Sequence, residues 1–433
     1  MNDLVSRRDF LGALGTGALL PAVAAGQTFT ASDVPVTSRE LWAWMRTQLV
    51  LQPGLAWFDT AGFGPALRAV MVREYRSRER QSLDFAAYRE TSMSPGELRR
   101  HLGVVAELLG AETDDLVFTT GSTEGLNVVA QGIGLQAGDE VLTTAHESGA
   151  AIYPWLLAAK RHGIKVVQLP HDAMTASPES IVGRFAGAIT PRTRVMAFAH
   201  VQATDGTVMP VRELCALARG NSIFTLIDGA LGPGLLDFRL ADVGCDAYAT
   251  AGHRWLNATF GTGILYLNRA ARARILPLAV DGSRGWDPND RFGAPLAMDG
   301  VPEAQARFGA LGRYQVPSLE GLGIAVEFQQ AVSRARVGAR VRELAAYLRS
   351  ALASLPSIQV LTPVHPALSS GIVSLRIAGR DHAALVQALA REDRIVVAHV
   401  AHGPAFDAIR VSLHASNDHD EIGRLVNGLR RRL

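Results

Sequence analysis

Seven short apolar segments, separated by helical patterns, occupy the middle of this chain of 433 residues. They cover residues 116–120, 140–144, 165–169, 194–200, 223–228, 246–250 and 263–267. Runs such as Val-Met-Ala-Phe-Ala at 195–199 show no polar alternation, which is typical of strands covered by helices on both faces. Strands that alternate with helices favour a doubly wound sheet. We therefore predict an α/β fold with a mostly parallel seven-stranded sheet, in which ligands bind at the carboxyl ends of the strands.

The pattern changes after about residue 302. A long helix-like stretch at 319–355 leads to strand-like segments at 358–361, 371–377, 395–400 and 409–413. This succession predicts a smaller α+β domain at the C-terminal end. We divide the chain into a leader at 1–26, a large domain at 27–300 and a small domain at 301–433. The first part of the large domain is expected to pack on the small one.

The N-terminal segment carries the features of an export signal. Ser-Arg-Arg-Asp-Phe-Leu at 6–11 resembles the twin-arginine signal, and an apolar run to about Leu20 is followed by small residues to Gly26. The run is too short to span a membrane. We expect the twin-arginine translocase to export the folded protein to the periplasm, with no membrane insertion after cleavage. A short buried helix is the alternative interpretation.

The composition excludes some classes of partner and site. With 43 basic and 41 acidic residues and no basic run interleaved with aromatics, a nucleic-acid partner is not expected. Cys215 and Cys245 are the two cysteines, and no Cys–His cluster has metal-ligand spacing, so we expect no metal site. We interpret both thiols as buried and free, and a disulfide remains the alternative. Lys160 and Lys165 are the only lysines.

Two polar motifs follow predicted strands. Gly-Ser-Thr-Glu at 121–124 stands between a strand and a helix, where backbone amides and the Ser122 and Thr123 hydroxyls can hold a phosphate. The same residues also form a plain capping box. Asp228 ends a buried strand, where a lone carboxylate is costly without a partner. It either meets a cation there or caps a turn.

A third motif completes the pattern. Residues 245–256 read Cys-Asp-Ala-Tyr-Ala-Thr-Ala-Gly-His-Arg-Trp-Leu, and Gly-Thr-Gly-Ile-Leu-Tyr follows at 261–266. These segments resemble the cofactor-lysine region of the class V aminotransferase family, which includes cysteine desulfurases and isopenicillin N epimerase-like proteins. The resemblance covers essentially the whole mature chain. It implies a fold-type I homodimer that binds pyridoxal phosphate (PLP).

The resemblance also assigns roles to individual residues. It implies that Asp228 pairs with the pyridine nitrogen and that Arg410 grips a substrate carboxylate. It places His146 near the ring as a stacking group, although a satisfied loop histidine fits equally well. Gln202 or Thr204 would stand beside the phenolic oxygen of the cofactor. The phosphate would be held by Ser122, Thr123, His253 and, across the dimer interface, Thr262.

Some positions depart from the family pattern. Leu231 replaces a frequent His or Gln, and Ala251 replaces a hydroxyl residue. In the N-terminal segment 57–65, Asp59 and Thr60 stand where Asn is common. The family's N-terminal stretch lies along the substrate pocket, whereas a plain turn is the other interpretation of this segment.

The largest departure is Arg254. Relatives bind PLP as a Schiff base to a lysine directly after the histidine, and the same lysine moves the α-proton. A guanidinium stays protonated, so it can form no imine and is no ordinary base. Lys160 lies in a helical pattern, and Lys165 opens a strand at the wrong end for the site. Covalent PLP chemistry of the usual kind is therefore not expected.

Three functional interpretations remain open. The first is an enzyme that binds PLP or its amine form (PMP) without a covalent link, with His146 or His200 as the base and Arg254 contacting phosphate or substrate. The second is a non-catalytic periplasmic binding protein on the same fold. The third is cofactor-independent chemistry, because fold does not determine function. We expect an amino-acid-like substrate held by Arg410, and we favour a desulfurase least because both cysteines lie in the large domain.

Overall fold

The computed structural model describes residues 29–280, 300–309, 315–402 and 406–433. The predicted leader at 1–26, with its twin-arginine signal, lies outside the described residues. None of the helices in the described ranges combines the length and hydrophobicity that a membrane span needs.

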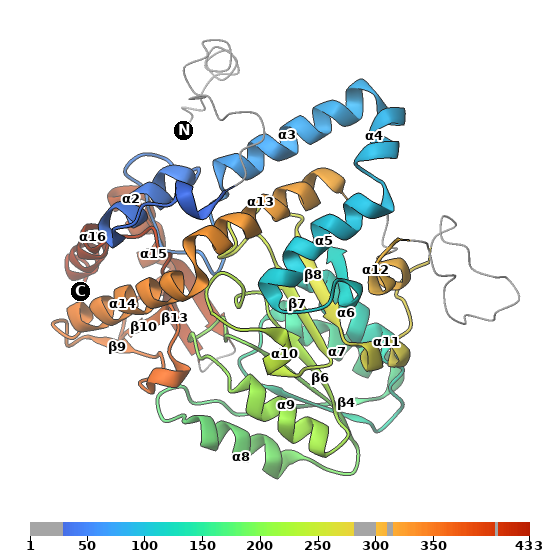
Figure 1. Ribbon diagram of the computed structural model, residues 1–433. Helices are drawn as coiled ribbons and strands as arrows, with labels where there is room; N and C mark the ends of the chain where they lie inside the picture. Colours follow the sequence, from blue (N-terminus) through green and yellow to red (C-terminus); the bar gives the residue numbers. More distant parts are fainter. Residues whose placement is uncertain (1–28, 281–299, 310–314, 403–405) are drawn as a thin grey trace, which may run out of the picture.

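A seven-stranded sheet forms the centre of the molecule (Figure 1). Its strand order is β2-β8-β7-β6-β5-β3-β4, and β8 alone runs antiparallel to its neighbours β2 and β7. The seven predicted apolar segments are these seven strands, so the predicted α/β fold with a mostly parallel sheet is confirmed. The bounds are β2 Leu116–Thr119, β3 Glu140–Thr144, β4 Lys165–Leu169, β5 Thr193–Ala199, β6 Phe224–Asp228, β7 Ala247–Ala251 and β8 Gly263–Leu267.

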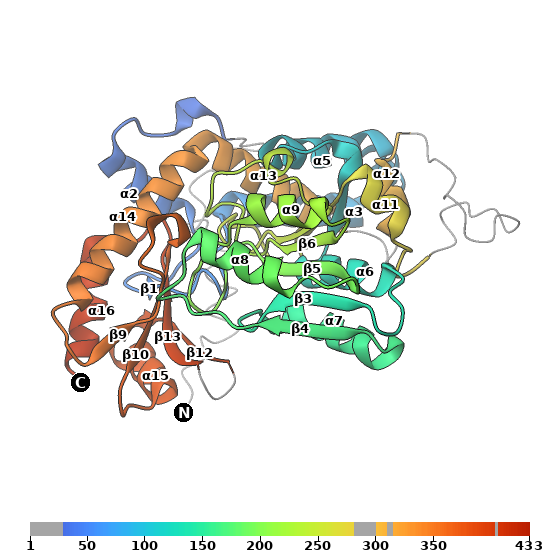
Figure 2. The same cartoon turned by 90° about the horizontal axis from the view of Figure 1, so that it is seen from below.

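Helices cover both faces of the sheet (Figure 2). Alternate side chains of β5 enter two separate apolar cores, with Val195 and Ala197 in one and Met196 and Phe198 in the other. Because both faces are buried, the strand needs no polar alternation. Helices α6 (Ser122–Gly132) and α7 (Gly149–His162) pack on one face. The other face is covered by α5 (Pro95–Leu109), α8 (Pro178–Ala188) and α9 (Val211–Gly220).

The C-terminal part contains an antiparallel sheet in the order β12-β13-β10-β9. Helix α13 packs on α3 and α5 of the large part, and α14, α15 and α16 pack around the small sheet. The bounds are α12 Glu303–Phe308, α13 Val316–Val332, α14 Arg334–Leu352, β9 Ile358–Val360, β10 Ile372–Ile377, α15 His382–Asp393, β11 Ile395–Val396, β12 Ala398–His402, β13 Phe406–Ser412 and α16 His419–Arg430.

The N-terminal segment contacts this C-terminal part. Strand β1 (Ala56–Trp57) pairs with β11, and Arg46 of α2 (Ser38–Gln48) forms an ion pair of 2.7 Å with Glu421 of α16. The remaining elements connect these layers. They are the 3₁₀ turns Ala31–Asp33, Thr113–Asp115 and Pro366–Leu368, and the helices α3 Arg68–Leu83, α4 Phe85–Thr91, α10 Leu240–Val243 and α11 Arg269–Arg274.

Two details differ from the sequence pattern. The helix expected at 319–355 is broken into α13 and α14 at Ser333, whose φ is +78°. The Ser333 amide closes α13 by donating to the carbonyls of Gln329 and Gln330, and no glycine or proline marks the break. Both Cys215 and Cys245 are buried and free. The expected free thiols are therefore confirmed.

Candidate active site

A cavity of about 330 Å³ opens at the carboxyl ends of the central strands. This is where doubly wound sheets bind ligands, and the volume lies in the range of small-molecule sites. Five segments that follow strands, and Ala61 of the N-terminal segment, contribute to its wall. The lining residues are Ala61, Thr120, Gly121, Ser122, Thr123, Glu124, Ser148, Ala150, Ala199, Val201, Ala203, Asp228, Ala230, Leu231, His253, Arg254 and Phe260.

The N-terminus of α6 faces this cavity. Its N-cap residue is Gly121, which supplies no side-chain cap, so the first amides of the helix are left for a ligand. Glu124 instead accepts from the amide and hydroxyl of Thr120, both at 2.7 Å. A side chain on Gly263 would come within 2.5 Å of the Gly121 Cα, so glycine is needed for β8 to approach this loop. The arrangement favours an anion such as a phosphate.

Asp228 brings a buried carboxylate to the same cavity. It is the last residue of β6, and it accepts from the Ala230 amide at 3.0 Å and from the Ser148 hydroxyl at 3.3 Å. Burial raises the pKa of Asp228, against these two hydrogen bonds and the nearby charge of Arg254, which lower it. A cationic N–H group placed against this carboxylate would offset the cost of its burial.

His253 and Arg254 form the turn after β7. The His253 ring stacks on Phe260 with centroids 4.4 Å apart, and burial lowers its pKa to about 4, so it is neutral at pH 7. Its Nδ1 atom is buried and finds no hydrogen-bond partner among the described residues. The Arg254 guanidinium donates to the carbonyls of Ala61 and Gly62, while its Nε atom, too, has no partner in the described part of the chain.

These features together suit one kind of ligand. An uncapped helix N-terminus and a guanidinium favour a negative group, while a buried carboxylate favours a cationic nitrogen. His253 and Arg254 both line the cavity, and each has a buried nitrogen without a partner in the described part of the chain, which leaves hydrogen-bonding capacity for a ligand. The cavity therefore fits a small molecule that carries both an anionic group such as a phosphate and a cationic nitrogen.

The comparisons with known proteins agree with this geometry. The model of the family "Aminotransferase class-V" matches residues 92–425. The chain belongs to the class-V aminotransferase family. Isopenicillin N epimerase of Streptomyces clavuligerus is 32% identical over 394 residues, which cover 90% of this chain and 97% of that enzyme. A probable cysteine desulfurase of Vibrio cholerae is 28% identical over 405 residues, covering 89% and 95%.

Solved structures show the same fold. A mutant of C-DES with glycine covalently linked to its PLP cofactor superposes with a TM-score of 0.79 at 24% identity, over 89% of this chain and 98% of that one. The Escherichia coli cysteine desulfurase CsdA gives 0.77 at 25% identity, over 90% and 98%. The class-V family is one of PLP-dependent enzymes, and the cavity described above offers groups that suit the phosphate and the ring nitrogen of PLP. Ser122, Thr123, Asp228 and His253 would hold it.

Arg410 of β13 lies close to this cavity and is already paired. It donates to the Asp59 carboxylate at 2.8 Å and to the Ala203 carbonyl at 3.0 Å, and its side chain is 9% exposed. Asp59 belongs to the N-terminal segment 57–65, which also contributes Ala61 to the cavity wall. A substrate carboxylate that bound Arg410 would have to compete with Asp59.

The two histidines predicted as bases are placed differently. The described lining of the cavity includes neither His146 nor His200. His200 is buried, with its Nδ1 atom 2.9 Å from the Tyr248 hydroxyl, and burial lowers its pKa to about 4. The His146 Nδ1 atom lies 2.8 Å from the Asp205 carboxylate. Both side chains are thus engaged outside the cavity wall.

Gln202 and Thr262 also lie behind the lining. Gln202 is fully buried and donates to the Thr144 hydroxyl at 3.0 Å and to the Glu147 carboxylate at 2.9 Å. The Thr262 hydroxyl donates to the Thr259 carbonyl at 2.6 Å. Contacts of Thr262 across a dimer interface remain a prediction.

Two cavity residues were missed by the sequence analysis. Ser148 follows His146 in the same loop after β3 and contacts Asp228. Phe260, 65% exposed, stacks on His253 at the mouth of the cavity. Both residues lie in loops at the carboxyl ends of strands, after β3 and β7, where the sequence predicted ligand binding. Loops have no periodicity, however, so the sequence did not show which side chain faces inward.

Proposed function

We propose that this protein binds PLP or PMP non-covalently and acts on an amino acid or an amino-bearing metabolite. The proposal rests on one observation above all: the uncapped N-terminus of α6 and the buried Asp228 carboxylate face the same cavity. A phosphate and a pyridinium nitrogen would satisfy both. The family contributes the identity of the molecule that carries these two groups.

Different residues of the cavity would bind different parts of the cofactor. The amides of α6 with the Ser122 and Thr123 hydroxyls would hold the phosphate, and His253 offers a neutral ring beside it. Asp228 would accept a hydrogen bond from the ring nitrogen and keep it protonated. When bound, the cofactor supplies an electron sink for a carbanion next to the substrate amine.

Arg254 is the reason why we expect the cofactor to bind non-covalently. It directly follows His253, where the family resemblance places the cofactor lysine. Its guanidinium is anchored to the carbonyls of Ala61 and Gly62, and its charge would attract the phosphate or a substrate carboxylate. It would thus orient the ligand rather than form a covalent link to it.

The described cavity wall has no side chain that is clearly free to act as a general base, and this favours a second candidate function. The described wall offers three side chains besides Arg254 that exchange protons, namely Glu124, Asp228 and His253. Glu124 is engaged by Thr120, and protonation of His253 is disfavoured by burial and by Arg254. A non-catalytic binding protein on the same fold is therefore the alternative, with cofactor-independent chemistry as the third.

Within the enzymatic interpretation, desulfuration is the least favoured reaction. A persulfide-forming enzyme needs a reactive cysteine at the substrate, whereas Cys215 and Cys245 are buried, and burial raises the pKa of both thiols. The similarity to isopenicillin N epimerase leaves epimerisation, amine transfer and elimination as candidate reactions for this chain.

We also propose a homodimer. An apolar hollow of about 380 Å³ adjoins the cavity, and Phe260 lines both. Met71 of α3, 47% exposed, lies in its wall. A second subunit would cover this surface and narrow the cavity mouth. Sedimentation should then give about twice the 46.3 kDa of the whole chain, less the cleaved leader, and Met71→Glu should shift it toward the monomer.

Export remains a proposal that the N-terminal sequence supports. We propose that the twin-arginine translocase carries the folded protein to the periplasm and that no part inserts in the membrane afterwards. Changing Arg7 and Arg8 together to lysine should retain the protein in the cytoplasm, as measured by cell fractionation.

The test of function uses mature protein purified from the periplasm. Its absorption spectrum is recorded, and the small molecules released by denaturation are identified by mass spectrometry. Release of PLP or PMP, without a protein adduct after borohydride treatment, is the expected result. Protein that stays colourless after incubation with excess PLP and PMP would overturn the proposal. The binding-protein interpretation would then stand, with phosphates and carboxylates as the ligands to screen.

A further inference from the structure

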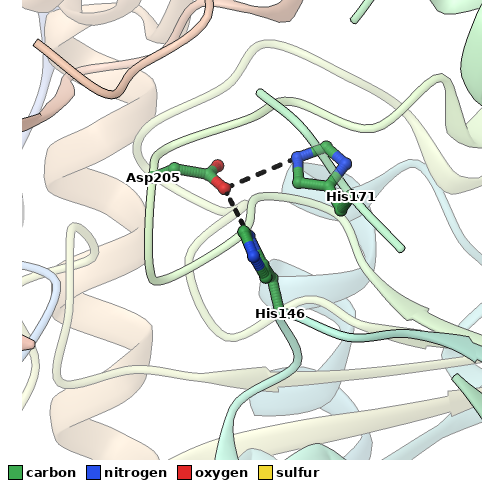
Figure 3. Close-up of side chains that lie close together, drawn as sticks. All are labelled: His146, His171 and Asp205. Atoms are coloured by element: carbon green, nitrogen blue, oxygen red, sulfur yellow. Dashed lines mark hydrogen bonds and ion pairs between the residues drawn. The ribbon is translucent and has the colours of Figure 1, made fainter. Parts of the chain in front are cut away.

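A cluster of two histidines and an aspartate lies outside the cavity wall, at the same edge of the sheet. His146 and His171 each follow a strand end by two residues, after β3 and β4 respectively. These strands pair in parallel with Thr144 opposite Leu169, so the two imidazoles emerge side by side. Asp205 comes from the loop after β5, which also pairs with β3. Figure 3 shows both rings directed at its carboxylate.

The distances bring three metal-ligand atoms together. The Asp205 Oδ2 atom lies 2.8 Å from His146 Nδ1 and 3.5 Å from His171 Nε2, and all three ligand atoms lie within 4.8 Å of one another. Ligand atoms of a tetrahedral zinc site are roughly 3.3 Å apart, given bonds of about 2.0 Å. Side-chain rotations that release His171 Nε2 from the Thr207 hydroxyl, now 3.0 Å away, would bring the three atoms to coordination distance.

Burial and outer contacts favour a cation at this point. The Asp205 side chain is fully buried, and its other oxygen accepts from the Thr207 amide at 2.9 Å and hydroxyl at 2.6 Å. These bonds orient the carboxylate so that Oδ2 faces the histidines, as outer-shell contacts do in metal sites. His171 is 3% exposed and His146 17%, so an ion would enter past His146.

We propose that His146, His171 and Asp205 bind a divalent transition metal such as zinc, with water completing the coordination. Two imidazoles and one carboxylate form a donor set that suits zinc and related ions rather than magnesium or calcium. The inference is independent of the proposed PLP function. The 25- and 34-residue separations along the chain explain why no local motif reveals the site.

The position of the site indicates its role. Val201 and Ala203, in the loop that carries Asp205, line the candidate active-site cavity, and the Ala203 carbonyl accepts from Arg410. A bound ion would join this loop to the loops after β3 and β4. It would stabilise the wall of the cavity without touching a ligand inside it.

The experiment measures zinc in untagged, cofactor-free protein, because a histidine tag or PLP would bind zinc itself. After EDTA treatment and dialysis against zinc, elemental analysis should give one zinc per chain, and Co²⁺ should give the visible bands of a site with four or five ligands. His171→Ala should weaken zinc binding more than about 100-fold, because even the loss of an outer-shell contact costs 10–100-fold. The exposed His162→Ala is the matched control and should bind as the wild type does.

His171→Gln serves as a second variant if His171→Ala does not fold, since it keeps more of the ring's volume. Folding of each variant is verified by circular dichroism. Wild-type protein that retains no zinc would overturn the proposal. So would variants at His171 that retain as much zinc as the wild type, because the ion would then bind elsewhere.

Discussion

Replacing Arg254 by lysine tests both the contacts of this residue and its place in the family pattern. The guanidinium donates to two carbonyls, those of Ala61 and Gly62, and lysine can keep at most part of this pairing. A hydrogen bond to a charged group contributes about 1.5–3 kcal/mol, so we expect a loss of about 2–4 kcal/mol. An unfolding entropy near 2.1 cal/mol/K per residue amounts to roughly 0.9 kcal/mol/K for 433 residues. The Tm of Arg254→Lys should therefore fall by about 2–4 °C.

The same variant should gain a covalent bond to PLP. A lysine amine at this position would reach the aldehyde if the other cavity residues hold the cofactor as proposed. The assay is a new absorption band on adding PLP, followed by borohydride reduction and peptide mapping of the modified residue. Wild-type protein controls for modification of Lys160 and Lys165, both remote from the cavity wall.

Arg254→Met is the matched control, because it removes the donors and supplies no amine. It should lose at least as much stability as Arg254→Lys and form no adduct. Arg254→Lys protein that binds PLP in equilibrium dialysis yet yields no adduct at position 254 would contradict this prediction. Residue 254 would then not face the aldehyde, and the correspondence with the family's lysine would be wrong.

Three further changes probe the surroundings of the cavity. Asp228→Asn should raise the Kd for PLP about 10–100-fold in equilibrium dialysis, because a charge-assisted hydrogen bond to the ring nitrogen is lost; an unchanged Kd would contradict the pairing. Asp59→Asn should tighten the binding of small α-amino acids several-fold, because Arg410 loses its competing carboxylate. Binding is measured from the absorption spectrum of the PLP-loaded protein. An unchanged affinity would mean that Arg410 does not bind the substrate. Burial raises the pKa of Glu147 to about 7, so this carboxyl contributes stability below about pH 4.5 that is lost as the pH rises through 7, about 3 kcal/mol in all. Buried histidines with lowered pKa values have the opposite effect on stability at acid pH, so the contribution of Glu147 has to be isolated by comparing wild type with Glu147→Gln. The difference between their free energies of unfolding in urea should change between pH 5 and 8. A difference that stays constant over this range would contradict the raised pKa of Glu147.

Much of the fold could be predicted from the sequence because its signals are local. A strand buried on both faces has to be apolar throughout, and β5 and β6 show this in their residues alone. The break between α13 and α14 could not be predicted in the same way. Ser333 adopts a positive φ without glycine, which reflects the packing of α13 on α3 and α5 rather than a local preference.

The candidate site was predictable in part for the same reason. Asp228 and the Gly-Ser-Thr-Glu motif stand at strand ends, and strand ends of a doubly wound sheet meet at one edge. His146 shows the limit of that rule. The sequence placed it at the correct edge, whereas the structure turns its side chain to Asp205 and leaves Ser148 facing the cavity.

By itself, the sequence determined the α/β architecture, the family resemblance and the chemical limit that an arginine follows His253. These follow from residue type and spacing along the chain, which need no knowledge of distant contacts. The tertiary structure decided which side chains share a space. The pairing of Arg410 with Asp59 spans 351 residues, and the cluster at Asp205 joins the loops that follow three strands. Such contacts depend on strand order and loop direction, because side chains meet through the packing of whole elements rather than through their separation in sequence.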